Sequence, residues 1–178
     1  MDSLRSRPIP DSLQGDSFWL ATMRRYLLAI LGGNLVWETL HLPLYTIWTE
    51  GTAGELIFAV VHCTGGDLLI ALSSLILALI FVGDAGWPAR KYRSVAVLAI
   101  SFGLGYTIFS EWLNTAVRES WAYSDLMPVV FGTGVSPVVQ WVAIPLAGFW
   151  WARRPMRIDG RPETHSLPTV TRRSKTHA

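Results

Sequence analysis

The sequence predicts an all-α integral membrane protein, a four-helix bundle with both termini in the cytosol. The 178-residue chain is 51% hydrophobic and only 16% charged, which is too apolar for an ordinary soluble domain of this size. Four apolar runs are long enough to cross a hydrocarbon core about 30 Å thick, which takes about 20 residues of helix. These two observations define the fold class, and the distribution of basic residues defines the orientation.

Lys and Arg residues concentrate on one side of the predicted bundle. Four precede the first span, three lie between the second and third, and seven follow the fourth, so 14 of the 15 fall on one side. Cytoplasmic segments carry the excess of Lys and Arg in membrane proteins. We therefore predict a multi-pass protein of the cytoplasmic (inner) membrane, whose partners include the lipid bilayer that surrounds it.

The predicted membrane domain covers residues 17–152. It is flanked by residues 1–16 and 153–178, which are polar, contain prolines and lack apolar periodicity. Such composition predicts a disordered cytosolic arm and a disordered basic tail.

The first two spans are predicted from apolar length and from the residues that interrupt it. The first covers about 26–48, with Pro43 bending or ending its helix. The second covers about 55–82 and contains Gly65-Gly66. This glycine pair predicts a loosened or closely approached backbone.

The other two spans follow the same reasoning. The third covers about 94–114, and its helix can continue to Ser120. The fourth covers about 135–152, with Pro145 predicting a kink.

A polar stripe lies in the outer half of the first span. Asn34, Glu38, His41 and Tyr45 recur at helical spacing, so they share one face. An ionisable group at membrane depth costs about 2.5–3.5 kcal/mol on insertion scales and usually faces the bundle interior or water. The stripe therefore predicts where the functional site lies.

Acidic groups from two other spans reach the same depth. At 1.5 Å per residue, Asp67 and Glu111 fall in the same outer layer as Glu38 and His41. We predict that these four residues form one catalytic site. Other polar and aromatic side chains near this layer are predicted to bind substrate; they are Asn34, Trp37, Tyr106, Ser110, Asn114, Gln140 and Trp141.

The favoured function is an intramembrane acid–base enzyme acting on a lipid-like or isoprenoid substrate. Two carboxylates in different surroundings, together with a histidine, are suited to general acid–base chemistry such as isomerisation, cyclisation or hydration. The rings of Trp37 and Trp141 could stabilise a cationic intermediate. The expected small-molecule partner is lipid-like. No nucleic-acid motif occurs, so no nucleic acid is expected as a partner.

A metal or haem site is the first alternative. Glu38-x-x-His41 has the spacing used in di-iron bundles, but those bundles need the pair twice, and Glu111-x-x-Asn114 has an Asn in place of the second His. A mononuclear site from Glu38, His41, Asp67 and Glu111 would have His62 as a fifth candidate ligand, and His41 with His62 could ligate haem. The sequence leaves the cofactor unknown.

A transporter, channel subunit or assembly factor is the second alternative, in which the cluster relays protons or only holds helices together. Four spans are few for an alternating-access carrier unless the protein forms a homo-oligomer.

Overall fold

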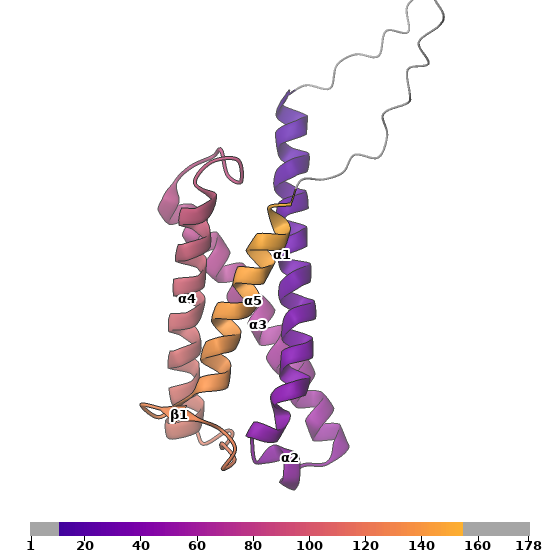
Figure 1. Ribbon diagram of the computed structural model, residues 1–178, viewed down its shortest axis with the longest axis vertical. Helices are drawn as coiled ribbons and strands as arrows, with labels where there is room; N and C mark the ends of the chain where they lie inside the picture. Colours follow the sequence, from indigo (N-terminus) through magenta and orange to yellow (C-terminus); the bar gives the residue numbers. More distant parts are fainter. Residues whose placement is uncertain (1–10, 155–178) are drawn as a thin grey trace, which may run out of the picture.

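The computed structural model describes the backbone of residues 11–154 and the side chains of residues 18–154. Residues 1–10 of the predicted arm and residues 155–178 of the predicted tail lie outside the described residues. Most of the described residues are helical, and one short β-hairpin precedes the last helix (Figure 1). The elements are α1 (Asp11–His41), the 3-10 turn η1 (Leu42–Leu44), α2 (Ile47–Glu50), α3 (Ala53–Val82), α4 (Tyr92–Trp112), the π-helical turn η2 (Leu113–Val117), β1 (Val129–Val130), β2 (Thr133–Gly134) and α5 (Val135–Ala152).

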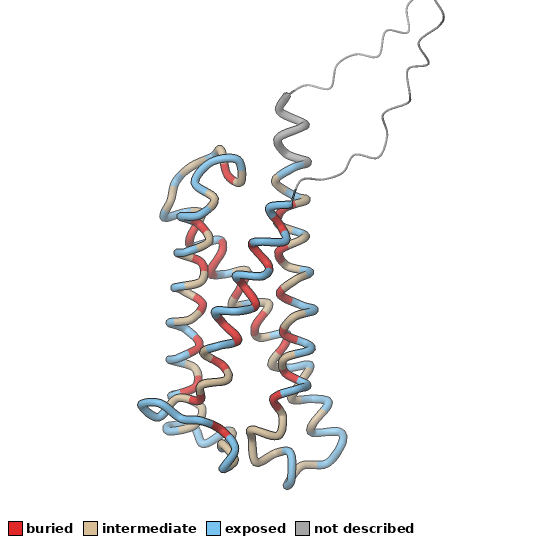
Figure 2. The backbone as a smooth tube through the Cα atoms, viewed as in Figure 1, coloured by how far each residue is buried: buried red, intermediate tan, exposed pale blue. Residues whose placement is uncertain are grey.

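Four helical segments are long and apolar enough to cross a membrane, as the sequence predicted. They cover Phe18–Leu44, Ala53–Val82, Tyr92–Val117 and Val135–Ala152. Buried positions recur along their inner faces, whereas large apolar side chains are exposed on their outer faces (Figure 2). This distribution is compatible with a small multi-pass membrane protein.

The four long helices form an up-and-down bundle. Each packs against two neighbours, in the order α1, α3, α4, α5 and back to α1. The described chain ends and the α3–α4 connection lie at one end, and the other two connections lie at the opposite end (Figure 1). We call these the terminal end and the distal end. The described basic residues of these three regions thus lie toward the terminal end; they are Arg24, Arg25, Arg90, Lys91, Arg93, Arg153 and Arg154.

Local sequence signals explain most helix boundaries. Thr52 and Glu55 form a capping box at the start of α3, and Gly83 ends that helix with φ of 60°. Pro43 ends α1 in a 3-10 turn, so the first span does not continue as one helix to residue 48. η2 extends the third span beyond 114, as expected.

The start of α1 differs from the prediction. The helix begins at Asp11 and includes residues 11–16, which we assigned to the disordered arm. Arg24 and Arg25 lie inside the helix instead of before it. A helix can extend beyond its apolar segment until a helix-breaking residue stops it. The last proline before the apolar segment is Pro10, and α1 begins at the next residue.

The expectation for Gly65-Gly66 is wrong. α3 is a continuous α-helix through both residues, and a Cβ added at either would meet no atom within 4 Å. Close helix approach occurs instead at Gly33, where an added Cβ would lie 2.8 Å from Ile144, and at Gly103, where it would overlap the Trp141 ring. These glycines let α1 and α4 pack tightly against α5.

Apolar side chains fill the terminal half of the bundle. Tyr26 stacks on Phe149 with ring centroids 4.3 Å apart, and Ile30, Leu75 and Val95 are fully buried beside them. The distal half differs, because its interior is lined by polar groups.

The two distal connections bind each other. The Thr46 N–H donates to the carbonyl of Ala122 at 3.0 Å, and the Ser124 N–H donates to the carbonyl of Leu44 at 3.0 Å. The Ser124 hydroxyl also donates to the carbonyl of Pro43 at 2.9 Å. These bonds hold η1 and the segment after η2 together around the distal opening of the bundle.

Candidate functional site

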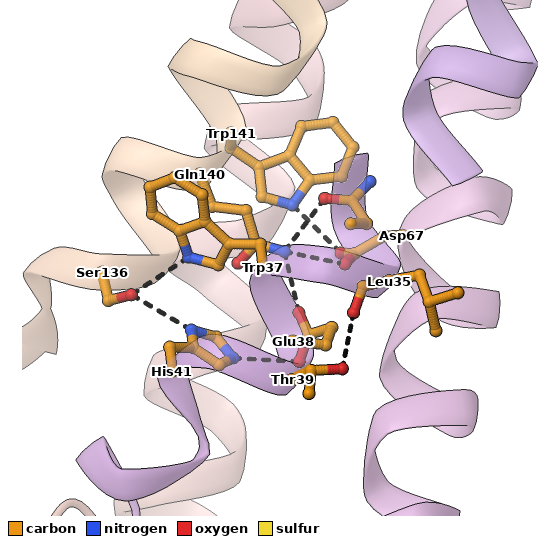
Figure 3. A network of polar contacts seen from close by, with 10 residues as sticks. Leu35, Trp37, Glu38, Thr39, His41, Asp67, Ser136, Gln140 and Trp141 are labelled. Atoms are coloured by element: carbon orange, nitrogen blue, oxygen red, sulfur yellow. Dashed lines mark hydrogen bonds and ion pairs between the residues drawn. The ribbon is translucent and has the colours of Figure 1, made fainter. Parts of the chain in front are cut away.

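Gln140 joins three helices at the centre of the distal half (Figure 3). Its Nε2 lies 2.9 Å from Asn34 Oδ1, 2.7 Å from Glu38 Oε1 and 3.1 Å from Asp67 Oδ2. Trp141 Nε1 donates to the other Asp67 oxygen at 3.2 Å. Since the amide NH2 has two hydrogens for three oxygens, the cluster is rich in acceptors.

His41 has a hydrogen-bond partner on each ring nitrogen (Figure 3). Nε2 lies 3.0 Å from Glu38 Oε2, and Nδ1 lies 3.0 Å from Ser136 Oγ. Trp37 Nε1 donates to the same Ser136 oxygen at 3.1 Å. Glu38 is therefore bound on one oxygen by Gln140 and on the other by His41.

Glu111 approaches from α4 and binds a different partner. The Tyr123 hydroxyl donates to Glu111 Oε2 at 2.5 Å and accepts from the Gly134 N–H at 2.9 Å. Burial and the hydrogen bond to Glu111 raise the pKa of the Tyr123 phenol, which therefore stays protonated as the donor. The third acid is thus held by the distal connection and not by Gln140.

A cavity of about 800 Å³ brings the predicted catalytic residues together. Glu38, His41, Asp67 and Glu111 all line it. This volume lies within the range of sites that hold small organic ligands. Of the residues predicted to bind substrate, five line the same cavity: Tyr106, Ser110, Asn114, Gln140 and Trp141.

The other two residues predicted to bind substrate, Asn34 and Trp37, do not line this cavity. Asn34 is buried behind Gln140 and accepts its hydrogen bond, whereas Trp37 donates to Ser136. Both side chains hold site residues in place.

The five candidate metal ligands line the same cavity but do not form a metal-binding group. Across the described residues, no three His, Cys, Asp or Glu side chains are arranged so that they could hold a metal ion. His62 is exposed on α3 and stacks on Phe58 with ring centroids 5.3 Å apart. Glu111 is hydrogen-bonded to Tyr123.

Acidic side chains dominate the cavity lining. Besides Glu38, Asp67 and Glu111, the lining includes Glu50 and Glu55 nearer the distal end. Among the described lining residues, Arg118 is the single Lys or Arg. Carboxyl groups therefore outnumber basic side chains in the described lining of the cavity.

One buried hydroxyl in the cavity wall lacks a partner. Thr107 is only 6% exposed, lines the cavity, and its Oγ1 has no hydrogen-bond partner among the described residues. Buried polar atoms are nearly always hydrogen-bonded, so this hydroxyl is free to bind a water molecule or a ligand in the cavity.

Part of the cavity lining is exposed. Phe58 and Leu69 on α3 and Tyr106 on α4 are exposed lining residues, and Glu50 and Gly51 lie at the distal end. The apolar cluster around Tyr26 and Leu75 fills the terminal half. The described lining therefore includes exposed residues on α3 and α4 and residues at the distal end.

Two groups that contribute to the site were not predicted. Ser136 lies at the start of the fourth span between Gly134 and Pro137, and Tyr123 lies in the connection between the third and fourth spans. Tyr45, part of the predicted stripe, packs against His41 with ring centroids 5.4 Å apart and also lines the cavity. The sequence signal at Ser136 is the Gly134 and Pro137 pair that flanks it.

Comparison of the chain with protein-family models, curated proteins and solved structures finds no match. Function must therefore be argued from the cavity itself.

Proposed function

We propose that this chain is an intramembrane acid–base enzyme acting on a lipid-like substrate, with both termini cytosolic in the cytoplasmic membrane. The observation that carries the proposal is the hydrogen-bonded chain Ser136–His41–Glu38, of which His41 and Glu38 line a cavity that also has exposed lining residues on α3 and α4. The reaction class is isomerisation, cyclisation or hydration of a substrate double bond.

His41 is suited to gain and lose a proton without losing a partner. When it is neutral with hydrogen on Nε2, it donates to Glu38 and accepts from the Ser136 hydroxyl. When it is protonated on both nitrogens, the same hydroxyl accepts from Nδ1 instead, because a hydroxyl can both donate and accept. Ser136 thus supports both states of a general acid or base.

The second acid, Glu111, has different hydrogen-bond partners from the first, Glu38. Glu38 is bound by His41 and Gln140, whereas Glu111 is bound by Tyr123 from another element. Two carboxyl groups in different surroundings can divide the roles of acid and base. In an isomerisation, the protonated Glu38–His41 pair would donate a proton to one carbon of a double bond, and the Glu111 carboxylate would remove a proton from the allylic carbon beside the other, so that the double bond moves by one position and no net proton is consumed.

The shape of the cavity favours an enzyme over a transporter. A hydrocarbon substrate could enter from the bilayer between Leu69 and Tyr106, and the Trp141 ring would face a cation formed inside. A carrier needs access from both sides of the membrane, whereas apolar side chains pack the terminal half here.

Deuterium incorporation tests the proposal without knowledge of the substrate. The purified protein in nanodiscs would be incubated in D2O with a total membrane lipid extract, and the lipids analysed by mass spectrometry. We expect one lipid species to gain carbon-bound deuterium, and Glu38→Gln to lower the rate by about 10²–10⁴-fold. Asp125→Asn, on the exposed distal connection, is the control and should exchange at the wild-type rate. Equal labelling by Glu38→Gln and wild type would contradict the proposal.

A further inference from the structure

We propose that the molecule bound in this cavity is an amphiphilic amine, with its hydrocarbon chain between α3 and α4 and its protonated amino group at Thr107 and Glu111. The inference rests on the proposed function, whose substrate class it narrows, but binding alone can test it.

Charge is the first argument. Glu38, Glu50, Glu55, Asp67 and Glu111 line the cavity with a single Arg. A phosphate or carboxylate head group inside it would meet like charges at short range, whereas a cation is attracted.

Asp67 and Glu111 form no ion pair with a Lys, Arg or His among the described residues. Within residues 18–154, the ion pairs are His41–Glu38 and Arg90–Asp84. Asp67 is bound by Gln140 and Trp141, and Glu111 by Tyr123, all of which are neutral donors. A ligand ammonium group would supply the missing charge.

The second argument is the unpartnered hydroxyl. Thr107 and Glu111 are four residues apart on α4, so they share one helix face, and both line the cavity. Thr107 Oγ1 is buried without a partner. An ammonium group has three N–H donors, which can reach a hydroxyl and a carboxylate together.

The rim of the cavity suits the rest of such a molecule. Phe58 and Leu69 on α3 and Tyr106 on α4 line the cavity and are exposed at 67%, 66% and 53%. Gly66 lines the cavity and leaves space, since an added Cβ there meets nothing within 4 Å. A hydrocarbon chain can lie along these exposed residues while the amine reaches Thr107.

Binding of tritiated dodecylamine to the protein in nanodiscs tests the proposal, with empty nanodiscs subtracted. Unlabelled dodecylamine, dodecanol and dodecyl phosphate would compete with it. We expect dodecylamine to compete at least about tenfold better than dodecanol, the size of one charge-assisted hydrogen bond, and dodecyl phosphate not to compete.

Two glycine variants give a matched control. Gly66→Leu places a side chain in the cavity and should abolish binding, whereas Gly65→Leu, on the adjacent residue that does not line the cavity, should bind as wild type. Thr107→Val and Glu111→Gln should each weaken dodecylamine binding about tenfold. Equal competition by dodecanol or dodecyl phosphate, or unchanged binding by Gly66→Leu, would overturn the inference.

The two proposals fail separately. Deuterium exchange without amine binding would overturn the amine inference and leave the proposed enzymatic function standing. Amine binding without exchange in any lipid extract would support the amine inference and contradict the proposed enzymatic function.

Discussion

The contact between Gly103 and Trp141 gives the sharpest test of how the site is assembled. A Cβ at Gly103 would overlap the indole ring of Trp141, with Cε3 of that ring only 2.6 Å away. The ring is 3% exposed and rigid, and its Nε1 donates to Asp67. Gly103→Ala should therefore displace Trp141 and break its bond to Asp67.

The size of the effect follows from three contributions. Replacing Gly by Ala in a helix gains about 0.8–1.0 kcal/mol. Overpacking a tight core costs about 1–3 kcal/mol, and one interhelical hydrogen bond in a membrane contributes about 0.6 and at most about 1.7 kcal/mol. The costs exceed the gain, so we expect Gly103→Ala to lower the free energy of unfolding by about 1–3 kcal/mol.

Gly105 is the matched control on the same helix. An added Cβ there meets nothing within 4 Å, so Gly105→Ala should be neutral or stabilising by up to about 1 kcal/mol. Unfolding in mixed detergent and dodecyl sulfate micelles, followed by circular dichroism, measures both variants. Deuterium exchange should also fall in Gly103→Ala and persist in Gly105→Ala. If the two variants unfold at the same midpoint, the tight α4–α5 contact does not hold Trp141 in place.

Three further predictions follow from individual contacts. Ser136→Ala should lower the deuterium exchange rate about tenfold because His41 loses a partner, and Ser136→Thr, which keeps the hydroxyl, should restore it. Gln140→Leu removes the donor of three buried acceptors and should lower the free energy of unfolding by about 2 kcal/mol in the same micelle assay. The Gly86 N–H and Arg90 hold the pKa of Asp84 below its ordinary value. The turn that this carboxylate stabilises is therefore intact at neutral pH and weakens as the pH falls through that lowered pKa. A carboxyl NMR titration of Asp84 should show a midpoint below about 3.9.

Each of these has a clear contrary result. Wild-type exchange by Ser136→Ala would show that the hydroxyl does not position the histidine. An unchanged unfolding midpoint in Gln140→Leu would mean that the buried acceptors find other partners. A carboxyl midpoint above the ordinary aspartate value would show that the turn does not favour the ionised form.

The number and extent of the spans could be predicted because they depend on local sequence. Apolar length and nearby Gly, Pro and Thr signals mark helix ends, so the predicted fourth span, 135–152, coincides with α5 and the predicted second, 55–82, nearly coincides with α3. Helical periodicity likewise placed Asn34, Glu38 and His41 on one inward face. The start of α1 escaped prediction because basic residues mark the membrane edge and not the end of a helix.

The amino-acid sequence alone therefore determined the helical class, the four apolar segments, the similar level of the acidic groups along the bundle and the gathering of basic residues into three stretches. Only the tertiary structure decided which groups touch: that Gln140 bridges Glu38 and Asp67, that Tyr123 binds Glu111, and that Asn34 and Trp37 stand behind the cavity. The physical reason is that periodicity fixes directions within one helix, whereas the rotation of each helix against its neighbours depends on contacts between distant residues, such as Gly103 beneath Trp141.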